Sequence, residues 1–307
     1  MSSFQKIIQD ISVELNINMK VVSKGWVIIL EKNGITRFII GQKFDLNSHA
    51  IGLVMDDKYA MFEVLSANNI PTIQYQMLYR PNIQKEYARN ANHYEIAEQY
   101  FIDHGESIVI KSNFGLSGID VYHVTKKEEI AFYLDKVFQN NETLSLCPFY
   151  DIKAEYRLIV LDNECLLMYG KKKPVIYGDG KRTIRELLQE FNPYYFNNKL
   201  SDSFYNKVLE TNEQYEYSWK FNLAEGAVPF PVQDIELQEQ LLNILNHITS
   251  KFDLGFCSLD IIETTDHKFY IMELNSGVSL HKYSYFFENS EKILKEIYKK
   301  AIQNLFR

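Results

Sequence analysis

Cysteine is scarce in this chain: three occur among 307 residues, and no two of them form a C-x-x-C pair. Cys147, Cys165 and Cys257 lie far apart, each within an apolar run. Disulfide frameworks and structural zinc sites need several suitably spaced cysteines. The sequence therefore predicts neither, and this use of cysteine favours a reducing, cytoplasmic setting.

Long hydrophobic runs are also missing. The first 15 residues lack the continuous apolar core of a secretory signal. No apolar stretch reaches the roughly 18 residues that a membrane-spanning helix needs. We therefore expect no secretory signal, no membrane association and a cytoplasmic protein.

Positive charge is not in excess. The chain has 33 Lys and Arg against 40 Asp and Glu, a net charge of -7. Proteins that bind nucleic acids need a basic face to neutralise phosphates, so we expect no nucleic-acid partner. A hydrophobic content of 46% is enough to build a full core in one to three lobes.

Several catalytic signatures are absent as well. The sequence contains no G-x-x-x-x-G-K-[ST] phosphate loop, no H-E-x-x-H zinc motif and no G-x-S-x-G nucleophile elbow. These absences argue against a P-loop nucleotidase, a zinc protease of that type and an α/β-hydrolase.

The apolar spacing predicts an α+β fold. Helical periodicity indicates helices over 3–15, 57–68, 92–104, 126–139, 234–251 and 285–306. Short apolar runs indicate strands over 72–78, 107–111 and 143–150, and hairpins over 26–40 and 155–170. Thr183 and Glu186 have the spacing of a capping box at the start of a further helix.

Residues 253–277 contain the strongest chemical signal. Asp260 lies in one apolar run, and Glu273 and Asn275 end the next one. Adjacent strands would bring these oxygen side chains together, and Mg²⁺ prefers oxygen ligands. Carboxylates near strand ends are also ordinary surface features, but Glu273 follows two apolar residues, which is less usual for a solvated carboxylate.

A second signal is a lysine at the end of an apolar strand, followed by a glycine-bearing loop. Lys111 would be partly desolvated there unless it met an anion. The loop 113–118 could bring backbone N–H groups to a phosphate, although an ordinary hairpin is the commoner meaning of such a loop. The run Lys171–Lys173 before Pro174 could clamp a phosphate or form a solvated turn.

The order of these segments resembles the ATP-grasp superfamily of carboxylate–amine ligases. It is most similar to the branch that contains cyanophycin synthetase and the ligase domain of bifunctional glutathione synthetase. The segments that carry the resemblance are DDKYAMFEVLSANNIPT, SIVIKSNFGLSGIDV, EYRLIVL with the following KKKP, GDGKRTIRELL, KFNLAEGAVPF, LGFCSLDII and FYIMELNSG. Together they extend over about residues 56–281.

The resemblance implies an ATP-grasp fold, in which two α+β lobes hold ATP between antiparallel sheets. It implies a short N-terminal segment over 1–55, a small lobe over 56–145, and a C-terminal lobe with the metal site over 146–307. Lys58 and Lys111 would then contact the phosphates or the adenine side of ATP.

The resemblance also assigns the remaining site residues. Ser117 and Gly118 would belong to the loop that covers the phosphates, and Glu155 would bind the ribose. Arg157 and Lys172 would stabilise phosphate or the anionic tetrahedral state. The residues implied to hold Mg²⁺ are Asp260, Glu273 and Asn275.

The implied substrates are a small-molecule carboxylate and an amine, such as an amino acid or a short peptide, with Asn222 and Gly226 on the acceptor side. Relatives in this superfamily are often dimers, so a homodimer is one state that the resemblance allows. Two departures stand out. Cys147 lies where many relatives carry a hinge carboxylate, and Ser276–Leu280 lacks the usual Pro-Gly turn.

Two other functions fit the same motifs. One is a non-ligase ATP-grasp protein that binds nucleotide or transfers phosphate. The other is a ligase that modifies a larger peptide, docked on the tyrosine-rich segment 192–220. Formation of a phosphorylated product without an amine would favour a phosphotransferase.

Overall fold

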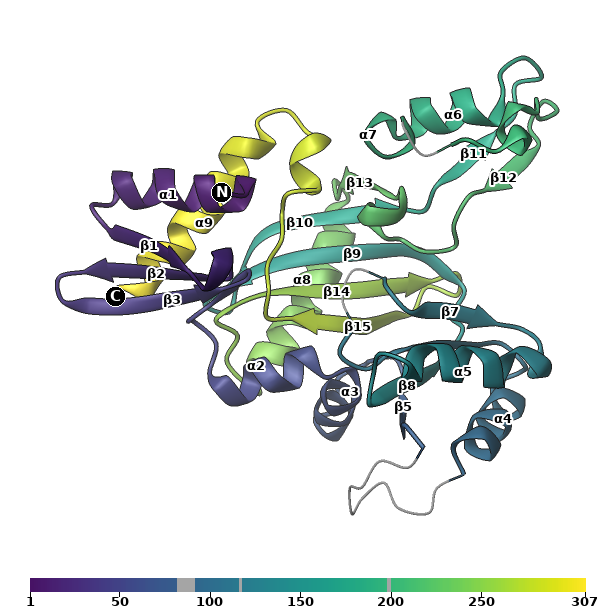
Figure 1. Ribbon diagram of the computed structural model, residues 1–307, viewed down its shortest axis with the longest axis horizontal. Helices are drawn as coiled ribbons and strands as arrows, with labels where there is room; N and C mark the ends of the chain where they lie inside the picture. The colour runs from purple at the N-terminus through teal and green to yellow at the C-terminus, as the bar shows by residue number, and fades with distance from the viewer. Residues whose placement is uncertain (82–91, 116–117, 198–199) are drawn as a thin grey trace. The chain divides into compact units, whose positions relative to one another are not determined.

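The computed structural model describes residues 1–81, 92–115, 118–197 and 200–307 (Figure 1). Helices and antiparallel strands alternate along the chain, which confirms the predicted α+β class. The helices are α1 (Ser3–Glu14), α2 (His49–Asp56), α3 (Lys58–Ala67), α4 (His93–Asp103), α5 (Ile130–Phe138), α6 (Ile184–Phe191), α7 (Pro193–Phe196), α8 (Ile235–Thr249) and α9 (Ser290–Leu305). Within these described ranges, no helix is both long and apolar enough to cross a lipid bilayer.

Within the described residues, the strands form four sheets. They are β1 (Asn18–Val22), β2 (Val27–Lys32), β3 (Ile35–Ile40), β4 (Lys43–Phe44), β5 (Gln76–Tyr79), β6 (Ile108–Ser112), β7 (Val121–Val124), β8 (Thr143–Pro148), β9 (Ile152–Leu161), β10 (Glu164–Lys172), β11 (Val175–Tyr177), β12 (Gln214–Glu216), β13 (Val228–Pro231), β14 (Phe256–Thr264) and β15 (Phe269–Asn275). The strand orders are β1-β2-β3-β4, β13-β10-β9-β14-β15, β11-β12 and β5-β8-β6-β7.

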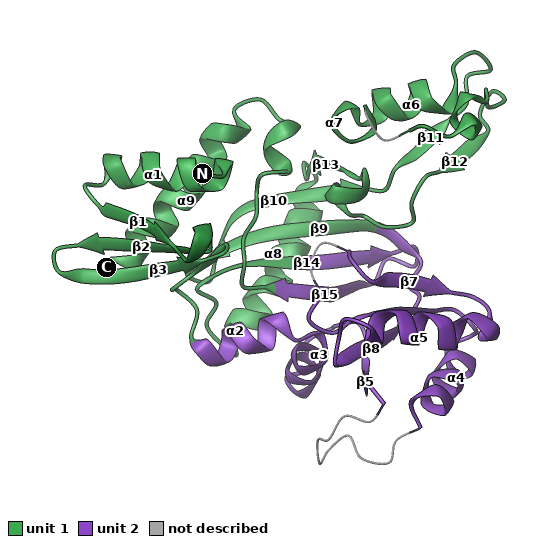
Figure 2. Ribbon diagram, viewed as in Figure 1, with its two compact units in different colours: residues 1–48, 154–259, 275–307 green, residues 49–153, 260–274 purple. Residues whose placement is uncertain are grey.

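The chain divides into two compact units (Figure 2). Unit 1 contains residues 1–48, 154–259 and 275–307, and unit 2 contains residues 49–153 and 260–274. Each unit is therefore assembled from segments that are distant in the sequence.

In unit 1, the two ends of the chain share one core. Helices α1 and α9 lie side by side on one face of the β1-β2-β3-β4 sheet (Figure 1). Ile8 and Ile11 of α1 are fully buried in the same cluster as Ala301 and Ile302 of α9. The predicted hairpin forms through Asn33 and Gly34, both at positive φ, which is the pattern of a tight two-residue turn.

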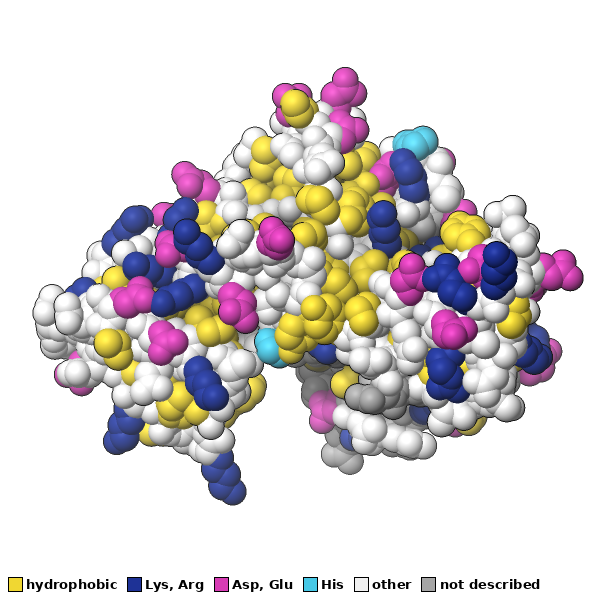
Figure 3. All heavy atoms as spheres, turned by 90° about the horizontal axis from the view of Figure 1, so that it is seen from above, with side chains coloured by type: hydrophobic (Ala, Val, Ile, Leu, Met, Phe, Trp, Pro, Cys, Tyr) yellow, Lys and Arg dark blue, Asp and Glu magenta, His cyan; other side chains and the backbone are white. Residues whose placement is uncertain are grey.

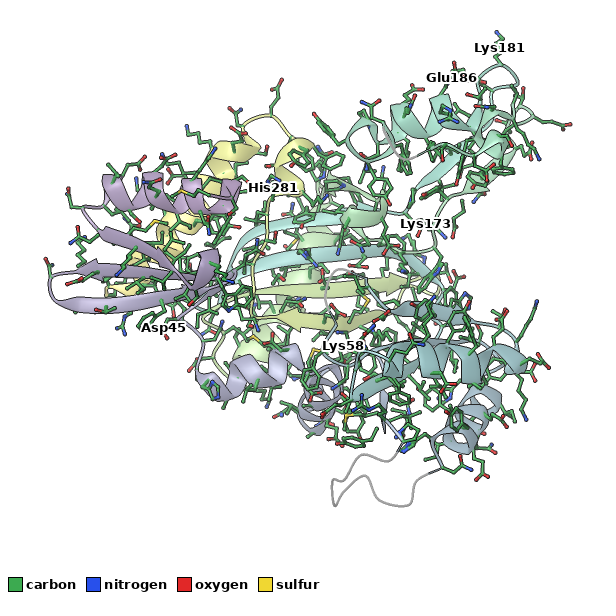
Figure 4. The ribbon with its side chains drawn as sticks, viewed as in Figure 1. Asp45, Lys58, Lys173, Lys181, Glu186 and His281 are labelled. Carbon is green, nitrogen blue, oxygen red and sulfur yellow. The ribbon has the colours of Figure 1, made fainter. Side chains whose placement is uncertain are left out.

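Unit 1 also carries a small body with its own core. The Thr183 side chain accepts from the Glu186 N–H, and the Glu186 carboxylate accepts from the Thr183 N–H, so α6 begins with the predicted capping box. Figure 4 labels Glu186 on α6 and Lys181 in the turn before it. The core residues of this body come from β11, α6, α7 and the following segment: Ile176, Ile184, Leu187, Leu188, Phe196, Leu200 and Leu209.

In unit 2, the sheet β5-β8-β6-β7 packs against α4 and α5. All five residues of β6 are buried, which explains its unbroken apolar sequence before Lys111. Helix α3 begins at Asp57, whose carboxylate caps the Ala60 N–H at 2.9 Å. The turn between β14 and β15 is closed by the Thr264 N–H, which donates to the Lys268 carbonyl at 2.9 Å.

The following elements are among those that differ from the sequence prediction. The strand expected over 72–78 begins only at Gln76, because the Ile73 N–H and the Pro71 carbonyl bond to Ile271 instead. Helix α9 begins at Ser290 rather than at residue 285, after Asn289 at positive φ. Helix α2 was not predicted.

Charges of both signs share the surface. On the face drawn in Figure 3, Lys and Arg side chains are interspersed with Asp and Glu. The ion pair between Lys127 and Glu98 measures 2.9 Å and is solvent-exposed. Exposed pairs contribute little because solvent screens them, so the fold depends mainly on its apolar cores.

The packing of Phe230 on Gly170 can be tested by substitution. The two residues are paired across β10 and β13, and a Cβ at Gly170 would overlap the Phe230 ring. We expect Gly170→Ala to lower the free energy of unfolding by about 1–3 kcal/mol, measured by urea denaturation. The matched control is Gly52→Ala in α2, where an added Cβ meets open space and should stabilise by up to about 1 kcal/mol. Equal shifts in the two variants would contradict this packing.

Candidate functional site

Two lysines are buried in unit 2. Lys58 is the first residue of α3 and is 7% exposed, and Lys111 on β6 is 6% exposed. Figure 4 labels Lys58 at the start of its helix. Lysine is almost never buried without an anion, so both positions indicate a site built around negative charge.

Glu273 on β15 is the carboxylate that both lysines approach. Its Oε1 atom lies 3.5 Å from Lys58 Nζ and 3.9 Å from Lys111 Nζ. Lys58 Nζ also donates to the Gly115 carbonyl at 2.8 Å. Burial lowers the pKa of Lys58, and the nearby Glu273 carboxylate partly opposes that shift. The Asp57 carboxylate acts on Lys58 in the same direction as Glu273, while the neighbouring Lys111 ammonium lowers its pKa further.

Tyr75 holds the second lysine. Lys111 Nζ donates to the Tyr75 hydroxyl at 2.6 Å and lies 4.6 Å from the centre of the same ring. The hydroxyl in turn donates to the Met272 carbonyl at 3.2 Å. Burial raises the pKa of Tyr75 well above its ordinary value, so the phenol keeps its proton.

Asn113 connects the glycine-bearing loop to α3. It is fully buried, its Oδ1 atom accepts from the Tyr59 N–H at 3.1 Å and from Ser145 Oγ at 2.7 Å, and its Nδ2 donates to Asp57 at 2.8 Å. Sequence reasoning treated Asn113 only as the start of the loop. The available signal was an amide immediately after a buried strand.

The loop itself is described in part. Gly118 has a φ of 74°, a left-handed conformation that glycine adopts without strain. Ser117 lies outside the described residues, so its predicted role stays a prediction.

The three predicted metal ligands lie on β14 and β15. Asp260 is 1% exposed on β14, Glu273 is half-buried on β15, and Asn275 is the last residue of β15. Among the described residues, no group of three or more His, Cys, Asp or Glu could hold a metal ion. Two carboxylates and one amide oxygen nevertheless fit Mg²⁺, which takes few protein ligands when phosphates and waters supply the rest.

In unit 1, Glu155 and Lys171 form a buried ion pair. They are directly opposite each other on β9 and β10, and they are 5% and 4% exposed. Lys172 is exposed, with its Nζ atom 5.2 Å from the centre of the Phe230 ring. Arg157 lies further along β9, opposite Tyr169.

The three lysines of the run 171–173 therefore lie in three different environments. Side chains alternate along a strand, so Lys171 and Lys172 point to opposite faces of β10. Lys173 pairs with Glu216 at 2.6 Å. The sequence alone did not distinguish the three, and it selected Lys172 rather than the buried Lys171. The predicted role of Lys172 stays a prediction.

The loop predicted on the acceptor side is held at both ends. Asn222 Oδ1 accepts from the Ala224 N–H at 2.9 Å, and Gly226 has a φ of 104°. The buried side chain of Asn192, which sequence analysis did not single out, donates to the Gly226 carbonyl at 2.9 Å. These contacts fix the backbone of the loop.

No protein-family model matches the chain. The glutathione biosynthesis bifunctional protein GshAB of Streptococcus thermophilus is 29% identical over 174 residues, which are 53% of this chain and 21% of that protein. D-alanyl-alanine synthetase A of Vibrio cholerae superposes with a TM-score of 0.57 at 13% identity, over 98% of this chain and 92% of that chain. A bifunctional glutathione synthetase of Pasteurella multocida gives a TM-score of 0.53 at 14% identity, over 96% and 44%.

The chain has the fold of the ATP-grasp ligases. The resemblance found in the sequence motifs is thereby confirmed at the level of fold. The chain spans about a fifth of the length of GshAB and less than half of the Pasteurella multocida protein. It matches nearly the whole of the Vibrio cholerae ligase structure.

The burial of the Glu155–Lys171 ion pair can be tested by substitution. Removing one partner of a buried ion pair leaves an uncompensated charge and costs about 3–5 kcal/mol. We expect Lys171→Met to lower the free energy of unfolding by that amount in urea titrations, and the double variant Glu155→Gln/Lys171→Met to lose less. Lys172→Met, at the exposed neighbouring position, should change it by no more than about 0.5 kcal/mol. Similar losses at positions 171 and 172 would contradict the assigned burial.

Proposed function

We propose that this protein is an ATP-dependent ligase that joins a carboxylate to an amine through an acyl phosphate. The observation that carries the proposal is the trio of unit 2, in which buried Lys58 and Lys111 both approach the carboxylate of Glu273. Polyphosphate offers the same oxygen chemistry with more negative charge, so two buried ammonium groups suit it. The ATP-grasp fold supports the same conclusion.

Within this proposal, we assign a residue to each part of the nucleotide. Lys58 and Lys111 bind phosphate oxygens, and the loop with Ser117 and Gly118 covers them and excludes water. Glu155 binds the ribose hydroxyls. Water exclusion matters because acyl phosphates hydrolyse readily, and a closing loop protects them.

Asp260, Glu273 and Asn275 would hold Mg²⁺ by their side-chain oxygens. When bound, the ion neutralises charge on the phosphates. The protein's own part is to present these oxygens from two neighbouring strands.

The chemistry then proceeds in two displacements. An oxygen of the substrate carboxylate attacks the γ-phosphorus of ATP, the bond to ADP breaks, and an acyl phosphate forms. The amine nitrogen attacks the acyl carbon, the bond to phosphate breaks, and the amine proton passes to solvent. Arg157 and Lys172 stabilise the anionic tetrahedral state between these events.

The names of the relatives support a proposal for the substrate class. Their names refer to glutathione and to D-alanyl-alanine, so we propose an amino acid or short peptide as the carboxylate and an amino group as its partner. Asn222 and Gly226 line the acceptor side. We further propose that the enzyme acts in the cytoplasm, in keeping with its three cysteines, which form no disulfide.

An ADP-release screen over paired carboxylates and amines, with mass detection of products, tests this function. We expect release to require both substrates and the product mass to equal their sum minus water. ATP binding without turnover on any pair would point instead to a nucleotide-binding protein. A phosphorylated product formed without an amine would identify a phosphotransferase.

Substitution of Glu273 tests the metal assignment. Glu273→Gln keeps the shape but removes the charge, so we expect turnover to fall by about 100-fold or more. The unfolding temperature should also fall, because Lys58 and Lys111 lose their anion, but a cooperative unfolding transition should remain. Glu263→Gln is a matched control, because this buried glutamate of β14 pairs with Lys153 and His267 instead. Near-normal turnover in Glu273→Gln would show that Glu273 is not a metal ligand.

A further inference from the structure

We propose that Tyr75 is a positioning residue that fixes the Lys111 ammonium where it meets a nucleotide phosphate. This inference rests on the proposed function and deepens it, since it names how one phosphate-binding group is held in place. Tyr75 itself touches no substrate in this assignment and acts through Lys111.

The backbone around Tyr75 explains how it reaches the site. Residues 71–73 hydrogen-bond to Ile271 of β15, and the chain then crosses to β5, which begins at Gln76. Tyr75 lies in this crossing, is 2% exposed, and packs edge-on against Phe62 with ring centres 6.4 Å apart. Its ring is therefore held by the segment that precedes β5 and by Phe62 of α3.

The hydrogen bonds of Tyr75 have only one consistent direction. Lysine carries donors and no acceptor, so the Tyr75 oxygen must accept from Lys111 at 2.6 Å. The hydroxyl proton is then free for the Met272 carbonyl, 3.2 Å away. The result is a continuous series of hydrogen bonds from Lys111 through Tyr75 to the Met272 carbonyl of β15, one residue before Glu273.

These hydrogen bonds restrict the flexible Lys111 side chain. A lysine side chain is a flexible four-carbon stem that loses rotamer entropy when its ammonium group is fixed. Glu273 Oε1 lies 3.9 Å from Lys111 Nζ, further than the Tyr75 hydroxyl. Without that hydroxyl, the ammonium would close on Glu273, and a phosphate would have to break a tighter ion pair to bind.

Binding measurements with ADP and adenosine, without added Mg²⁺, test the inference. Tyr75→Phe keeps the ring beneath the ammonium and removes only the acceptor. We expect about 10-fold weaker ADP binding by calorimetry, equivalent to about 1.4 kcal/mol, and unchanged adenosine binding. In a Lys111→Met background, Tyr75→Phe should change ADP binding less than 2-fold, because its effect passes through Lys111.

Kinetics provide a second readout. We expect Tyr75→Phe to raise the KM for ATP about 10-fold and to leave the KM values of the carboxylate and the amine unchanged. Tyr100→Phe is the matched control, because Tyr100 is also buried in unit 2 and its hydroxyl has no hydrogen-bond partner within the described part of the chain. It should alter neither ADP affinity nor the KM for ATP.

The outcomes of these measurements distinguish a failure of the role assigned to Tyr75 from a failure of the proposed function. If the wild-type chain binds neither ADP nor ATP, the proposed function fails. If Lys111→Met weakens ADP binding and Tyr75→Phe does not, the function stands and the role of Tyr75 is overturned. An equal loss of adenosine and ADP binding in Tyr75→Phe, or an undiminished loss in the Lys111→Met background, would also overturn it.

Discussion

The burial of two ammonium groups beside one carboxylate is the constraint on which the rest of unit 2 depends. Removing a lysine from water is costly unless anions and hydrogen-bond acceptors replace its hydration. Here Glu273 supplies the charge, and the Gly115 carbonyl and the Tyr75 hydroxyl supply acceptors. Each of these groups comes from a different segment of unit 2.

Several local features make sense only in view of this constraint. Asn113 ties the end of β6 to the start of α3, so the strand that carries Lys111 and the helix that begins with Lys58 keep a fixed spacing. The bonds of residues 71–73 to Ile271 hold β15 in the same unit. The trio is thus a product of tertiary contacts, since no short segment contains two of its members.

Much of this arrangement could be predicted from the sequence, and the reason is local. The hairpin through Asn33 and Gly34, the capping box of Thr183 and Glu186, and the buried strand before Lys111 all have signals within a few residues. The order of such segments was enough to indicate the ATP-grasp fold.

The remaining features could not be predicted, because they depend on partners distant in the sequence. Tyr75 looks like one more residue of an apolar strand until the structure shows that residues 71–73 pair with Ile271. Lys171 and Lys172 are identical as letters, and only their pairing across β9 and β10 distinguishes a buried partner of Glu155 from an exposed side chain. The shared core of α1 and α9 joins the two ends of the chain and has no local signal.

The trio also bears on how nucleotide and metal would bind together. Glu273 is at once the partner of two lysines and a proposed ligand of Mg²⁺, and one carboxylate cannot serve both at full strength. A phosphate that takes over Lys58 and Lys111 would release Glu273 oxygens for the metal, so each ligand would favour the other. Coupling of this kind is reciprocal by thermodynamic necessity. Lys58, Lys111 and Glu273 would therefore connect phosphate binding to metal binding.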